Sequence, residues 1–193
     1  MNDIIQRLKH KRFHAVAAVG YNNEIGLNGK MPWETTGMRL KRDLKRFKAL
    51  TMGRVVIVGR KTWESLPGPL PGRDFIVLTN ELAHETDEIV FVPHKDGKHC
   101  MVNLDQLEYL IETEYSDRDG FMVAGGSEIY ALFEPVINRC YITVVKETFN
   151  ADTYFPIDIL DVSKWRENYR EYVDEEQESG EVIKTAHITL NRR

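Results

Sequence analysis

Four short runs of aliphatic residues constrain the fold of this chain more than any other feature. They lie at 13–20 (FHAVAAVG), 55–58 (VVIV), 75–78 (FIVL) and 121–124 (FMVA). A strand with one solvated face alternates apolar and polar residues, whereas a strand covered on both faces reads as a continuous apolar run. We therefore expect these runs to form buried, mainly parallel strands of an α/β sheet whose faces are covered by helices.

Glycines and polar side chains follow three of these runs, where a strand gives way to a turn. The segments are 59–62 (GRKT), 79–80 (TN) and 125–130 (GGSEIY). Ligands of open α/β sheets bind at the carboxyl ends of the strands, and a helix start after a glycine turn offers backbone amides to an anion. The pattern predicts a nucleotide or phosphate site, although the GxGxxG fingerprint of the standard dinucleotide fold is absent.

One predicted helix carries an acid on its apolar face. Leu40, Leu44, Phe47 and Leu50 recur at helical spacing, and Asp43 lies three residues after the first of them and four before Phe47. Burial of an ionised carboxylate is costly without a compensating partner, so proteins keep one in such a place mainly where it binds something. Asp43 is therefore the leading candidate for a functional acid. The alternative is a structural carboxylate bonded to backbone amides at the helix start.

Composition narrows the class of protein. The 193 residues, 42% of them hydrophobic, suit a single domain over 1–193, with 1–12 as a short helical extension. A net charge of −4 argues against nucleic acid, and we interpret the basic face of the Asp43 helix, which includes Arg46, as solvated surface. The sequence shows neither a membrane-spanning apolar run nor a secretory signal, and Cys100 and Cys140 form no CxxC pair. A cytoplasmic location with reduced thiols is expected.

The second half of the chain predicts ordinary structural elements. Residues 89–93 and 98–103 flank Asp96-Gly97 as an exposed hairpin, 104–115 form an amphipathic helix and 140–145 form a further strand. Residues 165–173 and 182–190 form an antiparallel hairpin. His94, His99 and Cys100 lie close together in the sequence, but the hairpin explains this segment better than a metal site, and no metal is expected.

Taken together, the motifs resemble those of the dihydrofolate reductase family from Ala15 to about Leu190. Seven segments match in order: Ile25-Gly26, Met31-Pro32-Trp33, Asp43-Leu44-x-x-Phe47, Gly59 to Ser65, Leu70 to Arg73, Gly125-Gly126 with Tyr130, and Asp152-Thr153-x-Phe155-Pro156. One such motif is weak evidence, whereas the whole set at compatible spacing is highly specific.

The resemblance implies a fold and a function. The fold is a central, mostly parallel sheet of about eight strands with flanking helices and an antiparallel C-terminal strand. The activity is reduction of 7,8-dihydrofolate to 5,6,7,8-tetrahydrofolate by hydride transfer from NADPH, in support of one-carbon metabolism and thymidylate synthesis. The expected partners are dihydrofolate and antifolate-type small molecules, without nucleic acid or membrane, and the protein is expected to be a monomer.

The resemblance also implies a role for individual residues. Asp43 would bind the pterin ring, with Trp33 and Thr143 as the other catalytic residues, and Thr143 would hydrogen-bond the Asp43 carboxylate. The remaining substrate-binding residues would be Leu44, Phe47, Leu66, Leu70 and Arg73, of which Arg73 would grip the carboxylate of the glutamate tail. The cofactor-binding residues would be Ala18, Ile25, Leu27, Gly59, Arg60, Lys61, Thr62, Thr79, Asn80, Ala124, Gly125, Gly126, Ser127, Glu128, Ile129 and Tyr130. Among these, Arg60 and Lys61 would meet the 2'-phosphate.

The chain departs from the family pattern in three places. Nine residues separate Trp33 from Asp43, more than in common bacterial members, so this loop must take another path and Glu34 becomes a rival carboxylate. Ala124 replaces a larger aliphatic residue, and residues 94–101 form an insertion. Two other functions remain open: another pteridine or pyrimidine reduction, as in the reductase of a riboflavin pathway, and a catalytically silent binding module.

Overall fold

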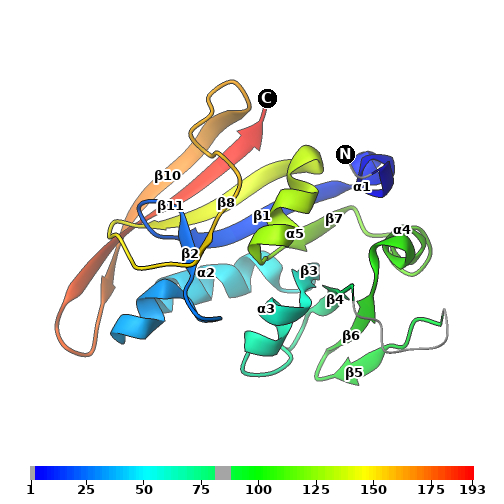
Figure 1. Cartoon of the computed structure of the whole chain (residues 1–193), viewed down its shortest axis with the longest axis horizontal. Coiled ribbons are helices and arrows are strands. Elements are labelled where there is room, and N and C mark those ends of the chain that lie inside the picture. The colour runs from blue at the N-terminus through cyan, green and yellow to red at the C-terminus, as the bar shows by residue number, and fades with distance from the viewer. Residues whose placement is uncertain (1–2, 81–87) are drawn as a thin grey trace. The chain divides into compact units, whose positions relative to one another are not determined.

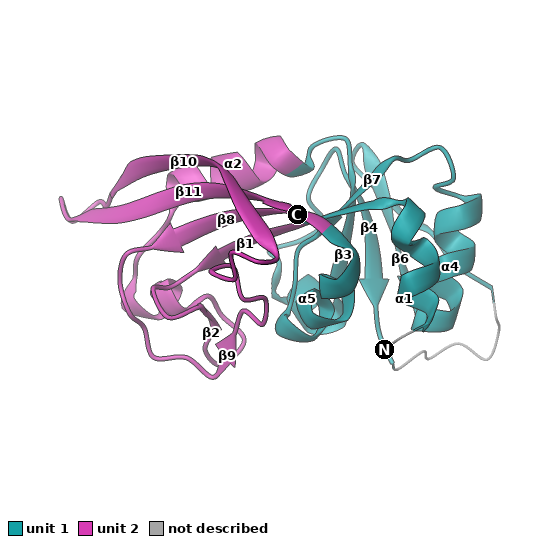
Figure 2. Cartoon of the chain, turned by 90° about the horizontal axis from the view of Figure 1, so that it is seen from above, with its two compact units in different colours: residues 1–14, 51–137 teal, residues 15–50, 138–193 magenta. Residues whose placement is uncertain are grey.

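The computed structural model describes residues 3–80 and 88–193, so the first two residues of the expected N-terminal extension lie outside it. The chain divides into two compact units, which Figure 2 shows in different colours. Unit 1 comprises residues 1–14 and 51–137, and unit 2 comprises residues 15–50 and 138–193. Each unit is built from two separate stretches of chain. The expectation of a single domain over 1–193 stays a prediction.

Unit 1 contains the parallel strands (Figure 1). Its strands are β3 (Val55–Gly59), β4 (Asp74–Leu78), β5 (Val92–His94), β6 (Gly97–Val102) and β7 (Gly120–Val123). They lie in the order β7-β3-β4-β6-β5, in which the first four run parallel and β5 pairs antiparallel with β6. The helices are α1 (Asp3–Arg7), η1 (Leu8–His10), α3 (Arg60–Ser65), α4 (Leu104–Thr113), α5 (Ser127–Phe133) and η3 (Glu134–Val136). The strands predicted at 55–58, 75–78 and 121–124 are confirmed.

The segment predicted as an exposed hairpin does form a hairpin, of β5 and β6, but β6 lies inside the sheet. Strand β6 pairs in parallel with β4, from Phe75 opposite His99 to Leu78 opposite Val102. Cys100 and Val102 are buried, and Met101 between them is exposed. This alternation is typical of a strand with one covered face, so the prediction of exposure was wrong for β6. Only the short strand β5 lies at the edge.

An aromatic cluster forms part of the core of unit 1. The Phe13 ring lies 5.4 Å from that of Phe121 and 5.1 Å from that of Phe133, measured between centroids. All three side chains are fully buried. Rings of this size remove a large apolar area from water, so they stabilise the unit through the hydrophobic effect.

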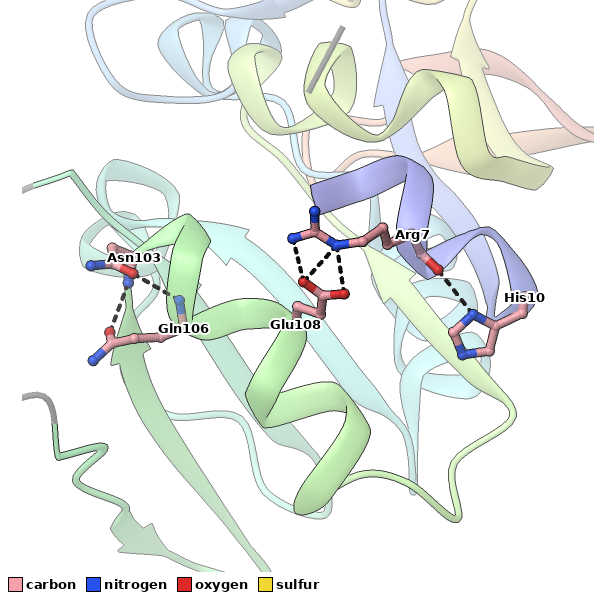
Figure 3. A network of polar contacts seen from close by, with 5 residues as sticks. All are labelled: Arg7, His10, Asn103, Gln106 and Glu108. Carbon is pink, nitrogen blue, oxygen red and sulfur yellow. Dashed lines mark hydrogen bonds and ion pairs between the residues drawn. The ribbon is translucent and has the colours of Figure 1, made fainter. Parts of the chain in front are cut away.

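The N-terminal helix is attached to unit 1 by apolar and polar contacts. Ile5 and Leu8 are 1% and 0% exposed. Arg7 donates to both carboxylate oxygens of Glu108 on α4, over 2.6–2.9 Å (Figure 3). Because this ion pair is solvated and the two apolar side chains are not, the apolar contacts make the larger contribution to stability.

Helix α4 begins with a capping box. Asn103 accepts a hydrogen bond from the Gln106 amide over 2.9 Å, and the Gln106 side chain accepts one from the Asn103 amide over 3.1 Å (Figure 3). This reciprocal pair satisfies two amides that the helix leaves without an internal partner. The inward positions Leu107, Leu110 and Ile111 are buried, as the sequence predicts.

Unit 2 contains the antiparallel strands. Its elements are β1 (Arg12–Val19), β2 (Glu24–Gly26), η2 (Pro32–Thr36), α2 (Lys41–Thr51), β8 (Ile137–Val145), β9 (Thr153–Tyr154), β10 (Trp165–Glu176) and β11 (Val182–Arg192). A few end residues of β1, α2 and β8 belong to unit 1. The strand order is β10-β11-β8-β1, with both pairings of β11 antiparallel. The C-terminal hairpin is therefore confirmed. Strands β2 and β9 form a separate small sheet.

The α/β class expected from the sequence is confirmed. Apart from the small β2–β9 sheet, the described residues provide five strands in unit 1 and four in unit 2, against an expected total of about eight. No helix of the described residues is long and apolar enough to cross a membrane. Within the same ranges, no three His, Cys, Asp or Glu side chains gather as a metal site would require. Cys100 and Cys140 are both free and buried.

We expect the substitution Leu8→Ala to lower the free energy of unfolding by about 2–5 kcal/mol, because it leaves a cavity beneath the N-terminal helix. Arg7→Ala is the control, because it removes only a solvated ion pair, and it should leave this free energy nearly unchanged. Urea unfolding with a constant slope measures both values. Equal losses for the two variants would contradict this ranking of the contacts.

Candidate functional site

Asp43 lies in the first turn of α2 and is half-buried. Burial raises the pKa of Asp43 above its ordinary value. A hydrogen bond from the Thr143 hydroxyl and the positive charge of Arg46 oppose this change, and the negative charge of Glu175 adds to it. Carboxylates whose pKa is perturbed by burial together with specific charges are enriched at functional sites. This environment matches the expectation for Asp43.

Arg46 is not part of a solvated basic face. Its Nη1 donates to the Thr143 Oγ1 over 3.2 Å, and its Nη2 donates to the Ile188 carbonyl over 3.1 Å. Burial lowers the pKa of Arg46, and the neighbouring Asp43 opposes that change. The prediction of an ordinary solvated face was therefore wrong at this position. Helical spacing places residue 46 one turn from residue 43, and this turn of α2 faces β8 and β11.

Glu175 on β10 caps the start of α2 from a distant part of the sequence. Its carboxylate accepts the Arg42 amide over 2.9 and 3.0 Å and the Asp43 amide over 2.9 Å. Leu40, which precedes the helix, has no side-chain oxygen to serve as an N-cap. Helix starts leave amides without internal partners, and a carboxylate there also interacts favourably with the helix dipole. Glu175 is 1% exposed, so it is a buried cap.

The long connection between Trp33 and Asp43 forms a short 3-10 helix and a clamped turn. Helix η2 ends at Gly37, whose φ of 82° lies in the left-handed region that favours glycine. The chain then passes Gln177, whose side chain accepts the Arg39 amide over 2.8 Å and donates to the Arg39 carbonyl over 3.2 Å. The added residues are thus accommodated by the tip of the β10–β11 hairpin.

Trp33 lies in the core of unit 2. It is 4% exposed, and its ring meets that of Phe149 edge-on with centroids 5.9 Å apart. It belongs to a cluster with Ala18, Leu40 and Met38. Glu34, the rival carboxylate, is exposed and accepts the Met31 amide over 3.3 Å. The structure therefore favours Asp43 as the functional acid.

The apolar face of α2 is only partly covered. Leu44 is 50% exposed and Phe47 is half-buried, whereas Thr51 is the only fully buried residue of the helix. An amphipathic helix normally buries its apolar stripe against the protein. An exposed leucine one position after a desolvated acid gives this helix the apolar and charged groups that a flat heterocyclic ligand requires.

The predicted substrate-binding residues Leu66, Leu70 and Arg73 lie in unit 1. Both leucines are half-buried. Arg73 is 5% exposed and donates to the Thr51 hydroxyl over 3.1 Å and to the Pro71 carbonyl over 3.2 Å. Burial lowers its pKa, but a guanidinium remains charged at neutral pH. A desolvated cation of this kind suits a carboxylate ligand.

Two glycine turns meet at the carboxyl ends of β3 and β7. The Gly59 amide donates to the Gly125 carbonyl over 2.8 Å. A Cβ on Gly59 would lie 3.1 Å from Ile129, and one on Gly125 would lie 3.2 Å from the Tyr130 ring. Gly125 has a φ of 105°, and its peptide bond to Gly126 is cis. Glycine at these two positions therefore lets Ile129 and Tyr130 pack closely against the turns.

The helices that follow these turns lack side-chain caps. Gly59 precedes α3 and Gly126 precedes α5, and neither helix start has a capping side chain. The Thr62 hydroxyl oxygen lies 3.3 Å from where a Gly126 Cβ would be. Amides in such a setting suit the oxygens of a pyrophosphate.

The other predicted cofactor residues of unit 1 surround this point. Arg60 pairs with Glu64 over 3.0 Å, and its side chain is 33% exposed. Lys61 and Asn80 are exposed, and Thr79 is buried with its amide bonded to the Val102 carbonyl. The remaining ones lie at or after the second turn: Ala124, Ser127, Glu128, Ile129 and Tyr130.

The predicted cofactor-binding residues Ala18, Ile25 and Leu27 lie in unit 2. Ala18 is a core residue of β1, and Ile25 lies on β2. Leu27 borders a hollow of about 320 Å³ together with Pro32 and Phe149. This volume is at the lower limit for a small-molecule site and could receive part of a ligand.

Sequence reasoning missed Glu175 and Gln177 at the site. A signal for Glu175 was present, because it lies two residues after Val173 on the covered face of a strand. A carboxylate on an apolar face is the same anomaly that identified Asp43. Its partner could not be found from the sequence, because 132 residues separate Glu175 from Asp43.

Comparisons with known proteins agree on one family. The sequence profile described as dihydrofolate reductase matches residues 12–192. Dihydrofolate reductase type 8 of Escherichia coli is 38% identical over 151 residues, covering 78% of this chain and 83% of the relative. The dihydrofolate reductase of Haemophilus influenzae is 33% identical over 160 residues, covering 83% and 87%.

A solved structure is similar along nearly the whole chain. It is dihydrofolate reductase from Enterococcus faecalis complexed with NADP(H) and RAB-propyl. The TM-score is 0.69 at 27% identity, and the match covers 95% of this chain and 98% of the other.

Proposed function

The chain belongs to the dihydrofolate reductase family, and we propose that it reduces 7,8-dihydrofolate to tetrahydrofolate with NADPH, using Asp43 as its pterin-binding acid. The observation that carries this assignment is the desolvated carboxylate of Asp43, whose pKa is raised by burial on the helix that matches the family motif. Reductive chemistry on a pterin needs a group that binds a cationic or proton-accepting ring, and an acid of this kind supplies it.

The residues of unit 1 fit the phosphates of NADPH. The two glycine turns lead into α3 and α5, whose starts have no capping side chain and would offer amides to the phosphates. Arg60 and Lys61 would hold the 2'-phosphate. When bound, the cofactor supplies the hydride that reduces the pterin at C6.

Asp43 would orient the pterin by accepting hydrogen bonds from its N3 and its exocyclic amine. A carboxylate on that edge of the ring does not reach N5, so water would deliver the proton that N5 gains. The carboxylate must be held in a fixed position both to orient the bound pterin and to stabilise the positive charge that develops on it. The hydrogen bond from Thr143 provides this restraint.

Substrate specificity would come from the apolar and cationic groups described above. Phe47 would pack beside the pterin, and Leu44, Leu66 and Leu70 would line the benzoyl group. Arg73, a buried cation, would hold the carboxylate of the glutamate tail. Trp33 would act on the site through the core that it shares with Leu40, which precedes α2.

Antifolate-type molecules would bind the same groups, because they also present a flat heterocycle with an amine edge. The expectations of a monomer, of no nucleic-acid partner and of a cytoplasmic location stay predictions. The alternatives of another pteridine or pyrimidine reduction and of a silent binding module are decided by assaying NADPH oxidation with dihydrofolate.

We expect wild-type protein to oxidise NADPH in a dihydrofolate-dependent manner and Asp43→Asn to lower this turnover at neutral pH by about 100-fold or more. Glu34→Gln, the control, should keep wild-type turnover, because Glu34 is exposed. The absorbance of NADPH follows both. Loss of turnover in the Glu34 variant alone would overturn the assignment of Asp43, and no turnover of the wild type at any pH would overturn the function.

Folding provides a second readout for Asp43→Asn. The folded-state pKa of Asp43 is raised, so the stability it contributes is present at low pH and is lost as pH rises through that pKa. The ionised carboxylate therefore destabilises the folded protein at neutral pH. Asp43→Asn should unfold at an equal or higher urea concentration than wild type at pH 7, which separates loss of function from loss of fold.

We expect Arg60→Ala to weaken NADPH binding roughly tenfold while leaving NADH binding unchanged, because it removes a charge-assisted contact to the 2'-phosphate. Glu64→Gln is the matched variant, since it frees Arg60 from its ion pair and should tighten NADPH binding modestly. Calorimetric titration measures the affinities. An equal loss for both cofactors in Arg60→Ala would show that Arg60 contacts another part of the dinucleotide.

A further inference from the structure

We propose that Arg46 and Glu175 are positioning residues that bias the charge of the Asp43 carboxylate in opposite directions while holding it in place. The inference rests on the proposed function of Asp43 and assigns two residues that would not touch the substrate. Arg46 acts through the Thr143 hydroxyl, and Glu175 acts through the backbone at the start of α2.

Arg46 determines which way the Thr143 hydroxyl points. A guanidinium has only donors, so the Thr143 oxygen that receives Arg46 Nη1 over 3.2 Å is an acceptor there, and its own proton is directed elsewhere. The Thr143 hydroxyl acts on the neighbouring Asp43, whose pKa it lowers. Thr143 is fully buried, so water does not compete for this proton. Arg46 thus stabilises the ionised acid both by its charge and by this relay.

The second hydrogen bond of Arg46 fixes the position of its guanidinium beside Thr143. Nη2 donates to the Ile188 carbonyl of β11 over 3.1 Å, and Thr143 on β8 pairs with His187, the preceding residue of that strand. The planar guanidinium therefore bridges two adjacent strands with two of its donors. This fixed fork distinguishes Arg46 from a lysine, whose single ammonium would not hold both contacts.

Glu175 acts on the same carboxylate in the opposite sense. One oxygen accepts both the Arg42 and the Asp43 amides over 2.9 Å, which fixes the backbone from which Asp43 projects. The same buried negative charge disfavours a second negative charge on Asp43. It also offsets the positive end of the helix dipole, which would otherwise favour an ionised acid in the first turn.

The remaining polar groups around Asp43 and Arg46 do not duplicate these two effects. Burial and the charge of Arg46 lower the pKa of His187, so it is neutral at neutral pH, and its Nε2 has no hydrogen-bond partner. The groups that face this cluster are Arg42 and Arg46 on α2, Tyr141 and Thr143 on β8, Tyr169, Glu171 and Glu175 on β10, and His187 on β11. Tyr169 and Glu171 are exposed and bonded to each other, which leaves Arg46 and Glu175 as the desolvated charges.

The test is the pH profile of the single-turnover rate of NADPH oxidation with saturating dihydrofolate. The rate falls about tenfold per pH unit above its apparent pKa, which belongs to the whole complex. Arg46→Met removes a cation, so the apparent pKa should rise and the profile should move to higher pH. At a fixed pH above the apparent pKa, the rate divided by the rate at the acid plateau should then be roughly threefold or more that of wild type. Glu175→Gln keeps an oxygen for both amides but removes the anion, and should move the profile to lower pH with a comparable fall.

Two further variants make the result specific. Arg46→Lys keeps the charge but cannot hold both contacts, so its profile should move to higher pH by less than that of Arg46→Met. Glu178→Gln removes an equal charge from the same hairpin, but Glu178 is 91% exposed and bonded only to Lys41 in the described ranges, so its profile should be unchanged. If Arg46→Met does not fold, the pH profiles of Glu175→Gln and Glu178→Gln are compared, and a shift to lower pH in the first alone supports the proposal.

Displacements in opposite directions for Arg46→Met and Glu175→Gln, with none for Glu178→Gln, support the proposal. The proposal is overturned if the pH profiles of the two variants move in the same direction. It is also overturned if neither profile moves while the rate at the acid plateau stays at its wild-type value. An inactive wild type would instead refute the proposed function, so the two failures are distinguishable.

Discussion

The removal of one carboxylate from water is the constraint on which the described site depends. Asp43 projects from a face of α2 that is partly covered, and burial raises its pKa. An acid in this position costs free energy when it is ionised, unless hydrogen bonds and charges compensate. Thr143 and Arg46 supply that compensation from within unit 2, and Glu175 limits it. The pKa of the acid is thus set by effects that oppose one another: burial and Glu175 raise it, whereas Thr143 and Arg46 lower it.

The fold of unit 2 brings these groups together. Thr143 lies on β8 and Glu175 on β10, and β11 pairs with both of those strands. The hairpin of β10 and β11 extends beyond the sheet, and its tip holds the chain before α2 through Gln177 and caps the helix through Glu175. Leu40, at the end of the longer connection after Trp33, occupies the N-cap position of α2 and has no side chain that can cap the helix. Glu175 of the hairpin caps the helix in its place.

Much of this could be predicted from the sequence, and the reasons for the failures are physical. The buried strands at 55–58 and 75–78 were found because continuous apolar runs have few other stable environments. Asp43 was found because a charge interrupts a helical stripe. Glu175 escaped because its partners lie more than 130 residues away, and only the register of the hairpin joins them. Arg46 was placed on the solvated face, because periodicity describes one helix and not the strands packed against it.

The central claim, that burial in unit 2 raises the pKa of Asp43, can be measured without substrate or cofactor. Protein labelled with ¹³C at the aspartate carboxyl groups would be titrated by NMR, with Asp43→Asn used to assign the resonance. Our account predicts that Asp43 titrates above the ordinary range of aspartates, about 3.9, because desolvation outweighs the hydrogen bond from Thr143. A midpoint at or below that value would contradict it, since the compensating groups would then dominate and the acid would be fully ionised.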